Sequence, residues 1–484
     1  MRRPFALVVL CAVVLLLAGC QAPSASPETE TGGDDLTPSE PATDYRSNSS
    51  APAAPETDRL GYENGYWYNE SLSVTTEDGL NETEREAVIA RTMARVERIR
   101  GLEFEETVTV SVVSRAEYRN STGGETGDSL RRFDNVKFEA LFFIGEDRDS
   151  IAVQSSNRGE SVLGYYSSQR GEIVIVSDSE TPTISRGTLA HELVHALQDQ
   201  HFGLESDART RDQVQGRNGL VEGDAVAVTQ TYTDRCGGEW RCIDRPAQSS
   251  GGGGDRHFGI NFMQYFPYSD GPGLVGTLRE RGGWSAVNDA YDDYPDGAAE
   301  VTYPERYPEW EPESVSLADR SSDDWERVRP STDRDRPDYA VVGPSAIAGS
   351  MAYTIADDYN ESSVVQTRDV INYEDGSLDN DDPYNYDLPA TNGWTGGRMH
   401  VYGDGDETAY VWRTTWASEA DARQFADAWA AVIAHWGGTR TTEGHWVIEE
   451  DSPYTDAVAV RVDGDTVTVV NAPTVDELDE VHDA

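Results

Sequence analysis

A run of good helix formers from Thr188 to Gln200, between Gly187 and Gly203, predicts one helix. Leucine, valine and alanine lie on nearly all sides of it, so we expect the helix to be buried. Yet it contains the sequence His-Glu-Leu-Val-His, and buried histidines need polar partners. The fold must therefore bring further polar groups to this helix.

The spacing of His191 and His195 favours a metal site. Helical residues four apart differ by about 40° around the axis and about 6 Å along it, so both imidazoles can reach one ion. Glu192 lies about 100° around from His191 and can accept a proton from water bound to that ion without being a ligand. The alternative, two histidines on a solvent-facing helix, fits the apolar neighbours less well.

Such a site needs a third protein ligand, and the sequence offers two candidates. His201 follows the first histidine by ten residues, but Gln198 stands where a glycine would let the chain turn back. If the helix continues, His201 lies about 240° around the axis from His195 and cannot reach the same ion. The other candidate is Glu222, in an apolar stretch that predicts a second helix from about Asn218.

These motifs resemble those of gluzincin-type zinc metallopeptidases and, more closely, a group of exported haloarchaeal-type surface lipoproteins. The resemblance covers roughly residues 160–310. It is carried by His-Glu-Leu-x-His-Ala-Leu-Gln-Asp-Gln from His191, Leu-Val-Glu-Gly-Asp-Ala from Leu220, Phe266-Pro267-Tyr268, Gly282-Gly283-Trp284 and Tyr303-Pro304-Glu305-Arg306-Tyr307.

The resemblance implies one Zn²⁺ per chain, held by His191, His195 and Glu222, with Glu192 as the general base in the hydrolysis of amide bonds. It also implies a zincin-like α+β domain, made of a small sheet, the active-site helix and the glutamate-bearing helix. By the same analogy, the strand expected at Ile173–Val176 would be the edge along which an extended substrate pairs.

The chain departs from the gluzincin pattern in two ways. Many gluzincins have an acidic residue four positions after the ligand glutamate, where this chain has Val226. Asp199 and Asp224 are therefore the candidates for orienting a ligand histidine. In addition, no histidine is marked as the residue that stabilises the transition state. The candidate oxyanion donors are four tyrosines: Tyr165, Tyr268, Tyr303 and Tyr307.

The amino terminus resembles a lipoprotein signal peptide over residues 1–19. Arginines precede an apolar run from Phe5 to Ala18, which is too short to span a membrane and ends just before Cys20. We expect Cys20 to be lipidated and to anchor the chain on the outer face of the cell membrane; the alternative is an uncleaved signal anchor. Residues 20–58 have almost no large apolar side chains and predict a disordered tether.

The charge excludes nucleic acid as a partner. With 39 Lys and Arg against 88 Asp and Glu, the formal net charge is −49, which repels phosphate backbones. Lys137 is the only lysine. An acidic, almost lysine-free composition is typical of a halophilic protein, whose surface charges are screened within about 3 Å in molar salt. Most acidic clusters are therefore expected to be solvated surface.

The mature chain beyond Cys20 contains two cysteines, Cys236 and Cys242. In an exported protein this short spacing predicts a disulfide, with free thiols as the alternative. Two cysteines alone do not make a zinc site.

The remaining patterns divide the chain. Residues 59–310 are expected to form the metallopeptidase domain, with a helix after Asn81 and a hairpin at residues 162–176. Residues 311–339 are acidic and almost without core side chains, which predicts a linker or long loop. Residues 340–484 are expected to form a smaller α+β domain, with a helix after Ser418 and a hairpin around Asp463-Gly464.

The sequence therefore predicts a lipid-anchored, cell-surface zinc peptidase that acts on a peptide or protein. The competing interpretation is a catalytically silent surface protein, or a peptide-binding module, in which zinc only joins two helices. Structural zinc sites usually have four protein ligands, so three ligands next to Glu192 favour hydrolysis.

Overall fold

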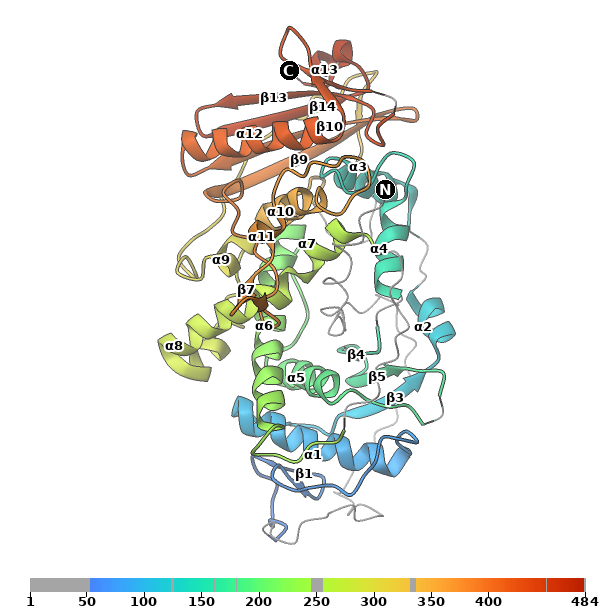
Figure 1. The fold of residues 1–484 in the computed structure, drawn as a ribbon, viewed down its shortest axis with the longest axis vertical. Coiled ribbons are helices and arrows are strands. Elements are labelled where there is room, and N and C mark those ends of the chain that lie inside the picture. Colours follow the sequence, from blue (N-terminus) through green and yellow to red (C-terminus); the bar gives the residue numbers. More distant parts are fainter. Residues whose placement is uncertain are drawn as a thin grey trace.

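The computed structural model is an elongated α+β protein. The first elements of the described residues lie at the lower end in Figure 1, and a large sheet lies at the upper end. The signal peptide, Cys20 and most of the tether lie outside the described residues. None of the described helices is both long and apolar enough to cross a membrane. The structure describes residues 53–122, 126–159, 162–179, 181–244, 256–330, 337–449 and 451–482.

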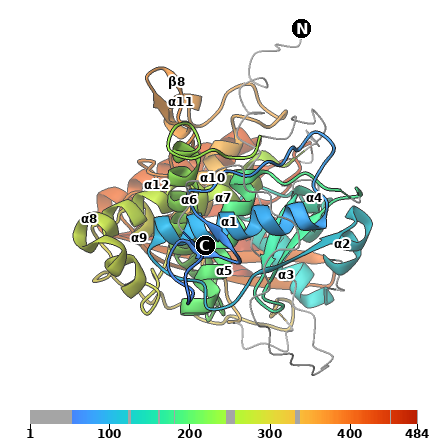
Figure 2. The same cartoon turned by 90° about the horizontal axis from the view of Figure 1, so that it is seen from below.

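The lower end is built from a short hairpin and a long buried helix. Strands β1 (Tyr62–Glu63) and β2 (Tyr66–Trp67) pack on α1 (Glu82–Arg100). The expected capping box is present, because the Asn81 side chain accepts from the backbone of Glu84 and the Glu84 side chain accepts from that of Asn81. Seen from below in Figure 2, α1 lies across the end of the molecule.

A three-stranded sheet follows, in the order β3-β5-β4. The predicted hairpin is confirmed, since β4 (Gly164–Ser167) and β5 (Glu172–Val176) are antiparallel, and β3 (Thr109–Val113) pairs parallel to β5. The prediction that Ile173–Val176 forms a sheet edge is wrong, because β5 is the central strand. The edge next to the motif-bearing helix is β4. The connection between β3 and β4 contains the helices α2 (Arg115–Thr122), α3 (Asp128–Glu139) and α4 (Ser150–Gly159).

The two helices expected to carry the site are α5 (Arg186–Phe202) and α6 (Arg211–Arg235), which pack on each other. Helix α5 runs beyond Gln200, as its composition predicted. Helix α6 begins at Arg211, seven residues before the predicted start, because Thr210 caps it in a box with Gln213. Glu222 is therefore in the middle of α6, not at its start.

Three further helices pack around α6. The composition did not predict α7 (Phe258–Ser269), which contains Pro267. Helix α8 (Gly271–Asp289) consists of two helical segments, because Gly282 and Gly283 between them have non-helical backbone angles. A short α9 (Ala298–Thr302) follows.

The segment predicted as a linker contributes to the core. Its β6 (Glu326–Arg327) pairs antiparallel with β9, and Leu317 and Trp325 are buried. These few apolar side chains are enough to attach an otherwise polar segment to the sheet.

The upper end is a seven-stranded sheet in the order β11-β12-β13-β14-β10-β9-β6. Figure 1 shows α12 along one face of it. The expected capped helix and hairpin are present as α12 and β13–β14. The elements are α10 (Gly343–Tyr353), α11 (Thr367–Val370), β7 (Tyr373–Glu374), β8 (Ser377–Leu378), β9 (Trp394–Asp404), β10 (Glu407–Trp416), α12 (Glu419–His435), β11 (Gly438–Arg440), β12 (Trp446–Ile448), β13 (Ala457–Asp463), β14 (Thr466–Ala472) and α13 (Val475–Val481).

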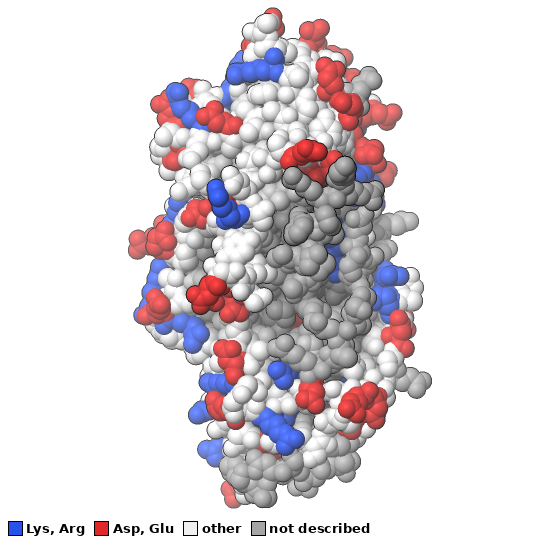
Figure 3. Space-filling view, in the orientation of Figure 1, with Lys and Arg blue, Asp and Glu red and all other residues white. Residues whose placement is uncertain are grey.

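The largest buried apolar cluster joins side chains from both sides of residues 311–339, including Phe142 and Trp429, whose rings contact each other. A second cluster lies between α1, α5 and the three-stranded sheet, and includes Leu193. Acidic side chains are spread over the upper and lower parts of the face in Figure 3 and do not gather in a single patch. This distribution fits a solvated acidic surface.

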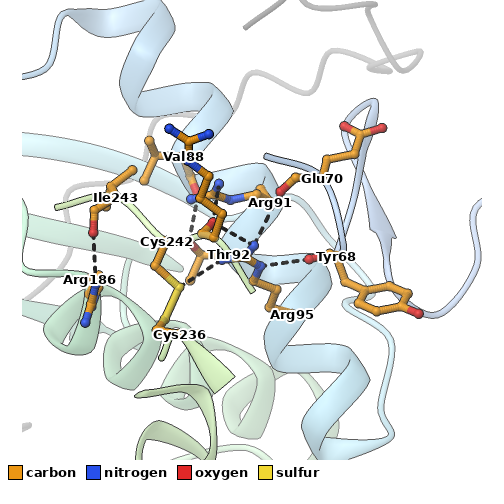
Figure 4. Close-up of a disulfide and its surroundings, with 11 residues drawn as sticks. Tyr68, Glu70, Val88, Arg91, Thr92, Arg95, Arg186, Cys236, Cys242 and Ile243 are labelled. Atoms are coloured by element: carbon orange, nitrogen blue, oxygen red, sulfur yellow. Dashed lines mark hydrogen bonds between the residues drawn. A yellow bond between two sulfur atoms is a disulfide. The ribbon is translucent and has the colours of Figure 1, made fainter. Parts of the chain in front are cut away.

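The predicted disulfide is present between Cys236 and Cys242 (Figure 4). Its loop is held on α1, because Arg95 donates to Cys242 Sγ and to the carbonyl of Arg241. Arg186, the first residue of α5, donates to the carbonyl of Ile243. The disulfide loop thereby connects the end of α6 to α1 and to the start of α5.

Candidate metal centre

The contact between α5 and α6 brings together the three residues named by the sequence as ligands. His191 Nε2 lies 3.2 Å from Glu222 Oε2, His195 Nε2 lies 3.3 Å from the same oxygen, and the two Nε2 atoms are 3.1 Å apart. All three side chains are buried. Three donor atoms thus form a small, nearly equilateral triangle in the protein interior.

The size of this triangle fits zinc. A tetrahedral ion with ligands at about 2.0 to 2.1 Å has ligand atoms about 3.3 to 3.4 Å apart, close to the observed edges. His191, His195 and Glu222 would hold such an ion and would leave its fourth position to a ligand outside this set. The donors therefore suit a three-ligand site with one open position.

The protonation states also suit a cation. Burial lowers the pKa of His191 and so favours its neutral form. Burial alone would raise the pKa of Glu222, but the neighbouring His195 and His191 outweigh it and hold that pKa at about 2. Neutral imidazole and ionised carboxylate are the forms that bind metals.

Helix α6 approaches its neighbours closely because it carries glycine where side chains would collide. A Cβ on Gly223 would lie 2.4 Å from the backbone of Gly271 at the start of α8. The neighbouring residue in sequence, Glu222, points to α5 instead. Glu222 therefore contacts α5, and Gly223 allows the close contact with α8.

Gln198 orients His195 from the side opposite the donor triangle. Its Oε1 lies 2.8 Å from His195 Nδ1, while its Nε2 donates to the carbonyl of Val221 at 2.9 Å and to Asp224 Oδ2 at 3.3 Å. Because the amide nitrogen faces two acceptors, the amide oxygen must face His195. An amide oxygen only accepts, so Nδ1 carries the proton and Nε2 keeps its lone pair toward the triangle.

Asp224 supports this arrangement one step further back. It accepts from Arg100 Nε at 2.9 Å and from Tyr291 Oη at 2.8 Å, and all these side chains are buried. The Arg100 guanidinium in turn lies 4.4 Å from the ring centre of Trp284. Asp224 therefore acts on His195 through Gln198, and the network ties α1, α6 and α8 to the site.

Glu192 is almost fully buried and is fixed by the edge strand of the sheet. Its Oε2 accepts from the backbone N–H of Tyr166 in β4 at 2.8 Å. The backbone of β4 therefore fixes the carboxylate of the glutamate that follows His191 in α5. The candidate base Glu192 is therefore in contact with the edge strand β4.

The four tyrosines that the sequence offers as oxyanion donors have different surroundings in the structure. Tyr268 lies on the site, with its ring stacked on His191 at 6.1 Å between centres. Tyr303 Oη donates to Asp387 and Tyr307 Oη donates to the carbonyl of Asp293, so both hydroxyls are engaged elsewhere. The ring of Tyr165 packs on Tyr118.

Two further candidates, Asp199 and His201, belong to α5 and form hydrogen bonds away from the triangle. Asp199 accepts from Tyr166 Oη and from the backbone N–H of Leu204. His201 donates from Nε2 to the carbonyl of Glu103 at 2.6 Å, on another side of the continuing helix.

Sequence reasoning did not identify Gln198 and Arg100 as parts of the site. The sequence alone marks Gln198 only as the residue that stands where a turn-forming glycine would be. The available signal was its position three residues after His195, on the same side of a helix.

One part of the chain matches a family model. Residues 326–482 match the model of a family described as a domain of unknown function, DUF8575. The match covers the seven-stranded sheet with α10 to α13 and excludes α5 and α6, which carry the donor triangle. No curated protein and no solved structure matches the chain.

Proposed function

We propose that this protein is a zinc-dependent peptidase with a zincin-like, gluzincin-type site, and that His191, His195 and Glu222 hold the metal ion. The observation that carries the proposal is the convergence of three buried donors, spaced for a tetrahedral ion, two of them on a helix in which a buried glutamate directly follows the first histidine. When bound, zinc polarises a substrate carbonyl and lowers the pKa of bound water to about 7.

The chain's own residues would supply the remaining steps. Glu192, fixed by Tyr166 N–H, accepts a proton from the attacking water and returns it to the leaving amine. Gln198 keeps the His195 Nδ1 protonated and its ring in place. Tyr268 is the candidate oxyanion donor, because its ring is stacked on that of the ligand His191.

The arrangement favours hydrolysis over a purely structural role for the metal. A closed structural site takes four protein ligands, and the donor group found in the described part of the chain has three. A buried carboxylate next to a three-ligand site has a direct use in proton transfer. A zinc staple between α5 and α6 would not need Glu192.

We further propose that the substrate is a peptide or protein, and that the enzyme acts outside the cell, anchored through Cys20. The edge strand β4 offers backbone groups for pairing with an extended chain. Its Tyr166 N–H is used by Glu192, so pairing would involve the other backbone groups of β4.

The test is digestion of a peptide library in molar salt. Purified protein with one zinc bound should cleave library peptides, and removal of zinc should abolish cleavage until zinc is restored. A zinc-loaded, folded protein that cleaves nothing in the library would favour the silent alternative.

A further inference from the structure

Helix α1 buries arginine side chains at the place where the disulfide loop meets it. Arg91 and Arg95, four residues apart and therefore on one side of the helix, are 1 % and 0 % exposed. Both side chains reach the same acceptor, because Nη1 of Arg91 and Nη2 of Arg95 donate to the carbonyl of Arg241 at 3.3 and 3.1 Å. Figure 4 shows the two arginines beside the disulfide. Two guanidinium groups therefore lie side by side in the protein interior.

The two arginines differ in how their hydrogen-bond donors are used. Each nitrogen of the Arg95 guanidinium has an acceptor: Nε donates to the carbonyl of Tyr68 at 2.8 Å, Nη1 to Cys242 Sγ at 3.3 Å, and Nη2 to two carbonyls. In contrast, Nε and Nη2 of Arg91 are buried and have no hydrogen-bond partner in the described part of the protein. Buried donors of this kind are unfavourable unless an ion or water binds to them.

The positive charges of this pair are not balanced by carboxylates. Among the described residues, no Asp or Glu forms an ion pair with Arg91 or Arg95. The carboxylates whose charge acts on them are Glu70 on Arg91 and the exposed Glu239 on Arg95, and each has less effect than burial. Burial and the charge of Arg95 lower the pKa of Arg91 to about 9. Arg91 is therefore still charged at neutral pH, and this buried cation lacks an anion paired with it.

We propose that Arg91 binds a chloride ion through Nε and Nη2. These two nitrogens form one edge of the planar guanidinium group, and their N–H bonds point in nearly the same direction, so both can donate to a single anion. Arg95 supplies a second positive charge close to that anion. An acidic, almost lysine-free chain is suited to molar salt, and molar chloride keeps even a weak halide site filled.

The anion would strengthen the attachment of the disulfide loop to α1. The carbonyl that both arginines share belongs to this loop, between Cys236 and Cys242. A bound anion attracts both guanidinium groups and offsets the repulsion between them. The same loop holds the start of α5, because Arg186 donates to the carbonyl of Ile243. We therefore expect chloride to stabilise the packing of α1 on α5, independently of peptidase activity.

The test is thermal unfolding of the zinc-loaded mature protein while chloride replaces gluconate at a constant molar concentration of potassium. The unfolding temperature of the native protein should rise by at least about 2 °C and level off as one site fills. Arg91→Met keeps a long side chain, removes the charge and both donors, and should abolish this saturable rise. Arg98→Met changes an exposed arginine of the same helix and should keep it. Because all three proteins meet the same salts, general effects of the anions on water cancel in the comparison.

Bromide provides a direct measurement of occupancy that does not depend on the folding of a variant. Bromide replaces chloride at halide sites, and its anomalous X-ray scattering marks its position in crystals of the native protein grown in KBr. A peak is expected at hydrogen-bond distance from both Nε and Nη2 of Arg91. The proposal is overturned if no bromide lies there, or if native unfolding shows no saturable dependence on chloride. It is also overturned if Arg91→Met retains that dependence, or if Arg98→Met loses it equally.

Discussion

Gln198 offers the sharpest test of how the site is organised. Gln198→Met keeps the length of the side chain and removes both its acceptor and its donor. The His195 Nδ1–H and the Val221 carbonyl then lose bonds of 2.8 and 2.9 Å. Because His195 is fully buried, no solvent replaces the lost acceptor, and the ring is free to rotate or change tautomer.

The expected loss follows from those two contacts. A buried polar group left without a partner costs about 1 to 3 kcal/mol. Removal of the residue that orients a metal ligand weakens metal binding about 10- to 100-fold, equivalent to about 1.4 to 2.7 kcal/mol. We therefore expect zinc affinity to fall within that range and the stability of the zinc-free protein to fall as well.

The assay is zinc competition with a chelator of known affinity, at constant pH and salt, with circular dichroism to establish folding. Gln200→Met is the matched control, because Gln200 is on the same helix and bonds the backbone of Glu105 and Glu106 instead. The zinc affinity of this control variant should stay within about twofold of the native value. A folded Gln198→Met with unchanged zinc affinity, or an equal loss in the control, would refute the reasoning.

Three other predictions concern ligation, the disulfide and anchoring. Glu222→Ala should weaken zinc binding at least about tenfold and His201→Ala hardly at all, as measured by chelator competition; the reverse order would contradict the assignment. Replacing Cys236 and Cys242 by serine should lower the free energy of unfolding by about 2 to 3 kcal/mol in denaturant titrations, from the entropy of a short loop, and an unchanged midpoint would contradict this. Native protein should partition into detergent with lipid on Cys20, and Cys20→Ser should not; mass spectrometry showing unmodified Cys20 in the membrane fraction would exclude this anchor.

Local patterns predicted the elements with strong periodicity and caps. The box of Asn81 and Glu84 predicted α1, and the alternation on either side of residues 167–171 predicted β4 and β5. The composition of α5 predicted that the helix would continue, which is why His201 lies on another side. In each case, the residues that decide the structure are neighbours in sequence.

Features that depend on distant contacts were not predictable in this way. The role of Gln198 depends on the Val221 carbonyl and on Asp224, which lie on α6. No local sequence pattern specifies how α5 and α6 align, so these contacts cannot be predicted. Strand β6 exists because Arg327 pairs with Tyr402, far along the chain. The central position of β5 in its sheet could not be predicted from the sequence for the same reason, because its parallel partner β3 lies much earlier in the chain.

The most direct test of the central claim compares the native protein with Glu192→Gln for zinc content and peptide cleavage in the same preparations. Glutamine keeps an oxygen that can accept from Tyr166 N–H and cannot accept the proton of the attacking water. The account predicts one zinc per chain in both proteins and cleavage that falls at least about 100-fold in the variant. A variant that binds zinc and cleaves at the native rate would contradict it.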